Sequence, residues 1–220
     1  MATCARGDSV DDDEDNRVLS KDFVSWFTRI QGSIAKSRKI RGGNYVQIAT
    51  VDEGKPKCRT VVFRGFIDHA GSSWMKMITD ARSEKVAQIM ASPSCEMVWW
   101  FPKSSEQFRI SGILHLVGPE SCGALFDARL DQWRNLSDMA REQFYWMHPG
   151  EEFAPLESGT VPPGGRDAEG KLLPVPDSFL LMLLEPNEVK YLRLKDNYAQ
   201  MDIKTDVDST THWVSQRVNP

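Results

Sequence analysis

The chain has 220 residues, of which 40% are hydrophobic and 26% are charged, and its formal net charge is -4. These values are those of an ordinary soluble globular protein with enough residues for one well-packed domain. The small negative charge gives no general attraction to nucleic acid or to an anionic membrane, and no apolar run is long enough to span a bilayer. We therefore predict a single domain with no nucleic-acid partner and no membrane partner.

The chain opens with an acidic segment. Residues 1–19 include the run DDDED and lack the apolar core of a secretory signal, and a transit peptide would be poor in acids. We predict that residues 1–19 form a disordered, solvated tail, that residues 20–220 form the domain, and that the protein is cytoplasmic. The four cysteines include no CxxC pair and the four histidines are scattered, so we predict free thiols and no metal site.

The first predicted element is a helix over residues 22–35. Its apolar residues recur at helical spacing, and Ser20 is suited to cap its N-terminus. The basic segment 36–41 that follows is typical of a solvated helix end.

Strands dominate the next stretch. Residues 45–51 (YVQIATV) alternate apolar and polar side chains, and two further strands are predicted over 58–63 and 74–79. The connections at 52–56 and 68–73 read as short turns. Strands joined by short turns indicate an antiparallel sheet.

One short helix interrupts the strands. Residues 83–91 change to a helical period and Pro93 ends the helix, after which 95–101 and 107–116 read as neighbouring strands. The absence of an alternating strand–helix–strand pattern argues against a Rossmann layout.

The second half adds helices and closing strands. Helical signals cover 121–133 and 137–146, and a loop rich in Pro, Gly and Glu covers 148–178. A loop of this length is usually disordered or functional. The closing strands are predicted at 179–184, 189–194, 201–204 and 212–218. We predict a mostly β fold with flanking helices, in which an antiparallel sheet closes or nearly closes into a barrel.

Polar residues cluster where the strand ending at Thr79 gives way to the helix. Arg82, Ser83 and Lys85 lie there with the free N–H groups and positive dipole end of the helix, which together suit a phosphate. Arg59 could complete such a site, and Gln107 offers a donor and an acceptor to a heteroaromatic ring edge.

A simpler interpretation stays open for each of these residues. The cluster at the helix start can be a capped helix with solvated charges, and helix caps far outnumber phosphate sites. Arg59 and Arg64 can form cross-strand ion pairs, and Gln107 can be a surface strand position.

Several phrases occur in the order found in a known family. They are NYVQIATV, RTVVFRGF, TDARSEK, EMVWWFP and EQFRISG, followed by MLLEPNEVKYLRLK near the end. With these phrases, residues 22–220 resemble the FMN-binding split barrel of the pyridoxamine 5'-phosphate oxidase family. The resemblance is greatest to its plant-type branch, the pyridoxine/pyridoxamine 5'-phosphate oxidase 2 proteins.

The resemblance implies an FMN-binding homodimer in which the flavin, and no side chain, carries the chemistry. The implied cofactor-binding residues are Arg59, Thr60, Val61, Val62, Arg64, Ile78, Thr79, Arg82, Ser83, Lys85 and Gln107. The implied substrate-binding residues are Arg64, Arg134 and Ser137. Gln107 would reach the flavin from the partner chain or from the barrel rim.

The chain departs from the family pattern at two places. The family's Ser-Arg-Lys phrase at the helix start is Ser83-Glu84-Lys85 here, and Arg82 is the candidate to replace the missing arginine. The family's substrate-contacting Arg-x-His phrase is replaced by Tyr198-Ala199-Gln200.

Three functions follow from the resemblance. The first is an FMN-dependent oxidase that converts pyridoxamine or pyridoxine 5'-phosphate to pyridoxal 5'-phosphate and hydrogen peroxide, with oxygen as acceptor, in vitamin B6 salvage. The second is an FMN-dependent reductase or other oxidoreductase of another small molecule, which the missing Arg-x-His phrase favours. The third is a non-catalytic flavin-binding protein.

Overall fold

A computed structural model describes residues 23–157, 159–207 and 210–220, so the predicted tail and Ser20 lie outside the described residues. The helices are α1 (Trp26–Ser37), α2 (Glu84–Ala91), α3 (Gly123–Arg134) and α4 (Asp138–Glu142), with 3-10 turns η1 (Gln143–Tyr145) and η2 (Pro163–Gly165). The strands are β1 (Tyr45–Asp52), β2 (Lys55–Val62), β3 (Phe66–His69), β4 (Ser72–Asp80), β5 (Ser94–Phe101), β6 (Glu106–Val117), β7 (Phe179–Arg193), β8 (Tyr198–Val207) and β9 (Thr210–Val218).

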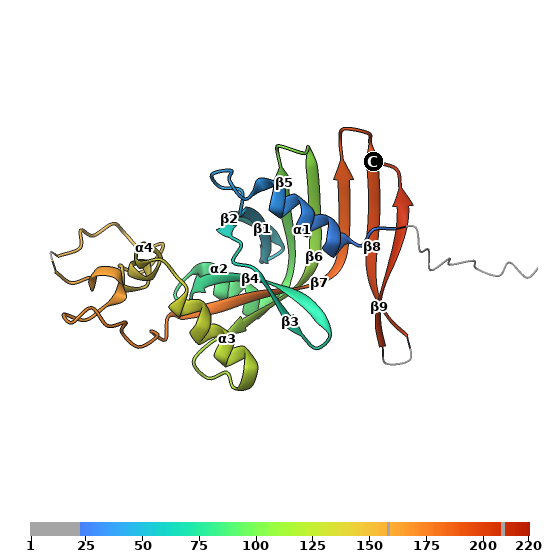
Figure 1. Ribbon diagram of the computed structural model, residues 1–220. Helices are drawn as coiled ribbons and strands as arrows, with labels where there is room; N and C mark the ends of the chain where they lie inside the picture. The colour runs from blue at the N-terminus through green and yellow to red at the C-terminus, as the bar shows by residue number, and fades with distance from the viewer. Residues whose placement is uncertain (1–22, 158, 208–209) are drawn as a thin grey trace, which may run out of the picture.

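All strand pairs of the sheet are antiparallel, in the order β2-β1-β5-β6-β7-β4-β3, and β8 joins β7 and β9. The chain beyond β2 returns to β4 through backbone hydrogen bonds from Arg64 N to Lys76 O (2.8 Å) and from Lys76 N to Gly65 O (2.7 Å). The strands thus curl into a barrel, with the β8–β9 hairpin on one side and α4 with the long loop on the other (Figure 1). The predicted mostly β, antiparallel fold with flanking helices is confirmed.

Three local predictions were wrong. Residues 68–73, predicted as a turn, contain the end of β3 and the start of β4, because the pairing of Phe66 with Met75 draws this short segment into the sheet. Residues 179–194, predicted as two strands, form the single strand β7. The first helix begins later than predicted, and Ser25 caps it by accepting a hydrogen bond from the Thr28 backbone N–H (3.2 Å).

The barrel is filled by large apolar side chains from the inner face of each strand. Trp99, Phe101 and Phe108 are almost fully buried there, and Trp26 and Ile30 of α1 pack against the same core. A separate cluster under α3 and α4 contains Trp133, Leu136, Ala140, Phe144 and Phe179. The barrel therefore presents rigid strand ends on which polar side chains can be held in place.

Gly112 lies where the pairing of β6 with β7 shifts register, between Ser111 and Gly112. A Cβ atom at Gly112 would lie 2.0 Å from the Glu185 carbonyl oxygen, so any side chain forces the two strands apart. We expect Gly112→Ala to lower the free energy of unfolding by about 1–3 kcal/mol, the typical cost of adding a methyl group to a closely packed core position. Urea denaturation measures this, and the control Ser111→Ala should stay within about 0.5 kcal/mol of the parent. An equal loss in both variants would remove the steric explanation.

The loop predicted over 148–178 holds the turn η2 and one isolated bridge between Arg166 and Leu172. It is anchored to α4: Arg141 Nε donates to Gly164 O (2.8 Å), and the Gly164 N–H donates to Glu142 Oε1 (2.7 Å). The turn η2 is therefore tied to α4.

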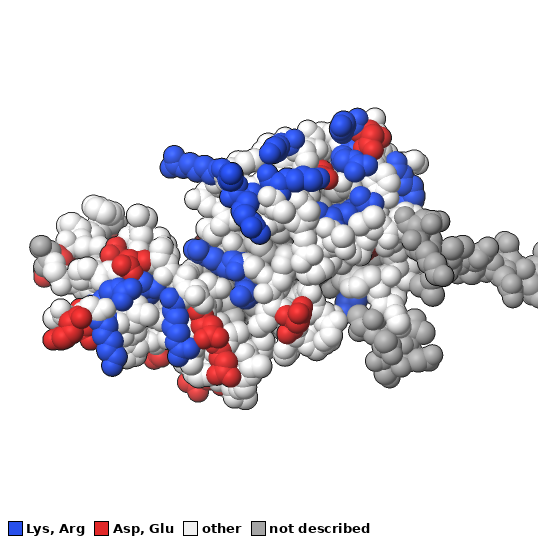
Figure 2. All heavy atoms as spheres, viewed as in Figure 1, with Lys and Arg blue, Asp and Glu red and all other residues white. Residues whose placement is uncertain are grey.

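The surface charges are unevenly spread. Figure 2 shows basic side chains gathered over the part of this face where α1 and neighbouring strand ends lie. Lys36, Arg38, Lys39 and Arg41, from the basic segment after the first helix, are all exposed. Among the described residues, no helix combines the length and the apolar character needed to cross a bilayer.

Candidate functional site

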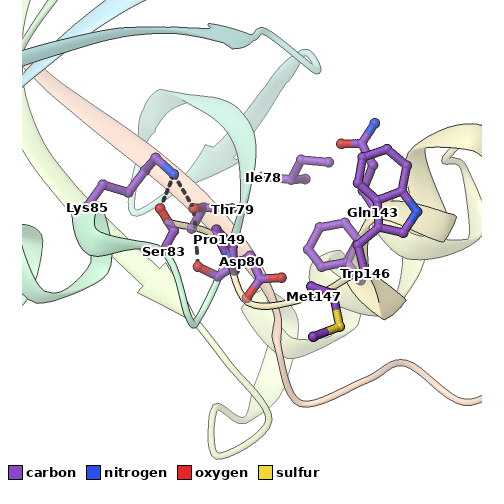
Figure 3. Close-up of a pocket in the computed structure, with 10 residues that line it drawn as sticks. Ile78, Thr79, Asp80, Ser83, Lys85, Gln143, Trp146, Met147 and Pro149 are labelled. Atoms are coloured by element: carbon purple, nitrogen blue, oxygen red, sulfur yellow. Dashed lines mark hydrogen bonds between the residues drawn. The ribbon is translucent and has the colours of Figure 1, made fainter. Parts of the chain in front are cut away.

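Lys85, Ser83 and Thr79 meet where β4 ends and α2 begins. Thr79 is buried at the end of β4, and Ser83 is the N-cap residue of α2 but makes no side-chain cap hydrogen bond. Lys85 Nζ instead donates to Ser83 Oγ and to Thr79 Oγ1, the latter at 3.2 Å (Figure 3). The predicted cluster therefore assembles, and the Ser83 hydroxyl contacts Lys85 instead of capping the helix.

Arg59 of β2 is held beside this cluster by two residues that the sequence analysis missed. Its guanidinium donates to Thr50 Oγ1 (2.6 Å) and to Gln88 Oε1 (2.8 Å), and Thr50 donates to the same Gln88 oxygen (2.7 Å). Gln88 and Lys85 lie three residues apart on α2 and so share one side of the helix. The sequence pattern did not mark Gln88, because it lies away from the face of Val86 and Ile89 on the predicted helix.

The site carries two positive charges, Arg59 and Lys85, and among the described residues no carboxylate lies in an ion pair with either of them. Burial, and then the positive charge of Arg59, hold the pKa of Lys85 below its usual value. An anion bound here would offset both effects, because it would restore the favourable surroundings that the ammonium loses on burial.

A cavity of about 340 Å³ opens beside the cluster. One wall is formed by Ile78, Thr79, Asp80, Ser83 and Lys85, and the other by Gln143, Phe144, Trp146, Met147 and Pro149 (Figure 3). The second wall comes from η1 and the start of the long loop. The sequence pattern did not predict this wall, although the length of the loop indicated that the segment could be functional.

Arg82 contacts Asp80 rather than facing the cavity as a free cation. Its Nε and NH2 groups donate to the two Asp80 oxygens at 2.9 and 2.7 Å, and NH1 donates to the Trp146 carbonyl (3.0 Å). The hydrogen bonds and charge of Asp80 raise the pKa of Arg82 above its usual value. Arg82 thus joins β4 to the far cavity wall, and its prediction as a phosphate ligand stays a prediction.

The remaining predicted cofactor residues are spread along the strands. Thr60 is exposed and Val61 and Val62 are half-buried on β2, while Arg64 is half-buried and its Nε has no hydrogen-bond partner among the described residues.

Gln107 pairs with Leu192 near one end of β7, whereas Ile78 pairs with Leu181 near the other. The two ends are separated by roughly 35 Å along the strand. Gln107 therefore lies toward the opposite end of β7 from the cavity.

Two of the three predicted substrate residues, Arg134 and Ser137, have side-chain partners within the chain. Arg134 is exposed and pairs with Asp131 (2.8 Å), and Ser137 caps α4 by accepting from the Ala140 N–H (3.4 Å). Neither lines the cavity.

Gln200, in the phrase that replaces Arg-x-His, is fully buried in a network of its own. Its oxygen accepts from Arg29 (3.2 Å) and Tyr198 (2.9 Å), and its amide nitrogen donates to Val24 O and to Asp202 (both 3.0 Å). Every polar group of this side chain is engaged in joining β8 to the start of α1, which leaves none for a substrate.

Residues 23–118 match the family model described as pyridoxamine 5'-phosphate oxidase, FMN-binding domain. The chain is also 32% identical over 205 residues to pyridoxine/pyridoxamine 5'-phosphate oxidase 2 of Arabidopsis thaliana, an alignment that covers 89% of this chain and 96% of the relative. The chain belongs to the pyridoxamine 5'-phosphate oxidase family. FMN is accordingly its cofactor, and the chain is an FMN-dependent oxidoreductase of that family.

Solved structures agree with this family assignment. A pyridoxamine 5'-phosphate oxidase-related, FMN-binding protein from Nostoc punctiforme is 34% identical, with a TM-score of 0.77 over 90% of this chain and 99% of that one. PhzG from Burkholderia lata, in complex with tetrahydrophenazine-1-carboxylic acid, shares the fold at 17% identity and a TM-score of 0.66, over 88% and 92% of the two chains. The predictions of family, split-barrel fold and FMN are confirmed.

The donors at the start of α2 fit the phosphate end of this cofactor. An ammonium, a guanidinium, two hydroxyls and the N-terminus of an eight-residue helix converge there. In proteins, a phosphate dianion is commonly bound by donors of these kinds. The two cations, Arg59 and Lys85, would compensate its negative charge.

Proposed function

We propose that this chain is an FMN-dependent oxidase of a pyridoxamine- or pyridoxine-type substrate, with oxygen as acceptor. The observation that carries the proposal is the convergence of Lys85, Ser83 and Thr79 beside Arg59, with no carboxylate from the described part of the chain paired to either cation. Relatives are named for the 5'-phosphates of both vitamers. Oxidation of those esters would give pyridoxal 5'-phosphate and hydrogen peroxide, as in vitamin B6 salvage, and oxidation of the free vitamers would give pyridoxal.

In this proposal the side chains bind and orient, and the bound FMN supplies the redox chemistry by accepting two electrons from the substrate carbon and passing them to oxygen. Arg59 and Lys85 hold the phosphate, with Ser83 and Thr79 accepting or donating at its oxygens. The strand segment Thr60 to Val62 and Ile78 of β4 flank the ring system. The wall formed by Trp146 and Met147 limits access of water to the cavity.

We further propose that two copies of the chain form the working enzyme. The position of Gln107, toward the other end of β7 from the cavity, supports this, because a second chain could bring its amide to the flavin. Trp100, which pairs with Gln107 and is 42% exposed, would then lie in that contact.

Lys85 predicts a pH dependence of FMN binding. The phosphate is a dianion above its second pKa of about 6, and Lys85 attracts it only while protonated. Because the pKa of Lys85 in the free protein is lowered, we expect affinity to fall with rising pH before an ordinary lysine would deprotonate. Fluorescence titration of FMN across the alkaline range measures this. Lys85→Arg should abolish the fall, because arginine keeps its charge, and a parent-like curve in that variant would exclude Lys85 as the titrating group.

The proposed reaction is tested with FMN-loaded protein, oxygen and each of pyridoxamine, pyridoxine and their 5'-phosphates. We expect hydrogen peroxide and the matching aldehyde in equal amounts. A reductase of another small molecule is the second candidate, favoured by the burial of Gln200 where the family phrase contacts substrate. Reduction of the bound flavin by a nicotinamide nucleotide, with no peroxide from any vitamer, would select that candidate.

A further inference from the structure

Arg82, in the turn between β4 and α2, fastens the far wall of the cofactor cavity to the barrel. Its NH1 group donates to the Trp146 carbonyl (3.0 Å) and its NH2 group to the Phe144 carbonyl (3.4 Å). The Ser178 hydroxyl also donates to the Phe144 carbonyl, at 3.5 Å. Within the described part of the chain, no further hydrogen bond joins residues 146–151 to the barrel. Beyond Phe144, the polar attachment of this wall therefore depends on Arg82.

Asp80 holds the Arg82 guanidinium in the orientation that reaches the wall. Nε donates to Asp80 Oδ1 (2.9 Å), NH2 donates to Oδ2 (2.7 Å), and the Arg82 backbone N–H donates to Oδ1 (2.8 Å). A two-point pair of this kind fixes the plane of the guanidinium and hence the direction of its remaining donors. The arginine is thus braced by a carboxylate of β4 on one side and bound to the wall on the other.

The same wall faces the cluster that is proposed to bind the FMN phosphate. Pro149 lines the cofactor cavity together with Ser83 and Lys85 (Figure 3). A neighbouring hollow of about 540 Å³ is lined by residues 82–84 on one side and by residues 148–151 on the other. Ser83 therefore faces this segment in both spaces, and a phosphate held by Ser83 and Lys85 would lie against it.

We propose that Arg82 is a positioning residue for FMN: braced by Asp80, it holds residues 146–151 over the phosphate end of the cofactor and so slows its release. The inference rests on the proposed function in placing the phosphate at the Lys85 cluster. Arg82 acts through the wall and not as a ligand of the phosphate, because its Nε and NH2 groups are fully engaged and NH1 already serves the Trp146 carbonyl.

Two carboxylates near Lys85 allow these two roles of Arg82 to be separated. Burial lowers the pKa of Lys85, and the negative charges of Asp80 and Glu84 both oppose this effect. Removing either carboxylate should favour a bound phosphate dianion, because like charges repel. Asp80 alone of the two braces Arg82, since Glu84 is exposed and takes no part in the described hydrogen bonds of Arg82.

The test measures FMN release from the loaded full chain, by the change in flavin fluorescence after dilution into an excess of a flavin-binding apoprotein. We expect release from Arg82→Ala to be about tenfold faster, the effect of losing one hydrogen bond made by a charged group. Arg82→Lys keeps the charge but lacks the fork of donors, and should recover little of the loss. Asp80→Ala should also speed release, whereas its matched control Glu84→Gln should leave release unchanged or slow it.

Hydrogen exchange of the apoprotein gives a readout that does not involve the cofactor. Backbone amides of residues 146–151 should exchange faster in Arg82→Ala and Asp80→Ala than in the parent or Glu84→Gln, and thermal unfolding reports any general damage. Parent-like release or parent-like exchange in Arg82→Ala overturns the proposal. Slower release from Asp80→Ala also overturns it, because an arginine freed from Asp80 would then be binding the phosphate.

Failure of the proposed function is distinguishable from failure of this role. None of these measurements uses turnover, so the absence of peroxide from every vitamer would end the oxidase function and leave the role of Arg82 intact. A phosphate bound elsewhere would appear as parent-like FMN affinity in Arg59→Ala, and that result would overturn the role of Arg82 together with the placement of the phosphate.

Discussion

Replacing Arg59 by alanine is expected to weaken FMN binding by about 1.5–3 kcal/mol, the worth of a hydrogen bond to a charged group, or roughly 10- to 150-fold in Kd. Thr50 and Gln88 orient the guanidinium before the cofactor binds, so no side-chain freedom remains to be lost on binding. Isothermal titration of the apoprotein with FMN measures the change.

Two further variants separate binding from folding. Arg59→Lys keeps the charge but loses the fork of donors, and should recover only part of the affinity. Gln88→Leu removes one of the two partners of the Arg59 guanidinium and leaves Thr50, so it should weaken binding less than Arg59→Ala does. Thermal unfolding without FMN reports any structural damage. If Arg59→Ala titrates as the parent does, Arg59 has no part in the site.

Replacing Trp99 by alanine is expected to lower the free energy of unfolding by about 3–5 kcal/mol, as for other large aromatic residues in a packed core. Trp99 is 1% exposed, lies between Phe63 and Phe101, and donates its indole N–H to Gly43 O (3.1 Å). The variant loses both the packing and the hydrogen bond of the indole N–H to Gly43. Urea denaturation, followed by far-ultraviolet circular dichroism, measures the loss.

Trp100 is the matched control, because it is the adjacent residue of the same strand and is 42% exposed. Side chains alternate faces along a strand, so Trp100→Ala leaves the barrel core intact. We expect it to change stability by less than about 1 kcal/mol at concentrations where the chain is a monomer. A loss as large as that of Trp99→Ala in the monomer would contradict the inward orientation of Trp99.

The strongly periodic helices and strands could be predicted because residues close together in the sequence determine them. The alternation at Tyr45–Asp52, the change to a helical period at Glu84–Ala91, and Pro93 beyond it all act within a few residues. The strand Phe66–His69 was not predictable, because four residues have too little pattern and its pairing with β4 supplies the stability. The continuous strand Phe179–Arg193 was split in the prediction at Pro186 and Asn187, which the sheet accommodates opposite the register shift at Gly112.

The residues of the candidate site likewise include some that the sequence predicted and some that only the structure revealed. Thr79, Ser83 and Lys85 lie within seven residues, so a strand followed by a helix necessarily brings them together, and the sequence by itself determined that cluster. Its family phrases also determined the cofactor. Only the tertiary structure decided which groups surround the cluster: Gln88 turned toward Arg59, Arg82 bound to the Trp146 carbonyl, and the Trp146 wall beside the cavity. Gln88 and Arg59 are 29 residues apart, and Arg82 and Trp146 are 64 residues apart. The geometry of these contacts depends on how the barrel and the α4 segment pack, which no local pattern encodes.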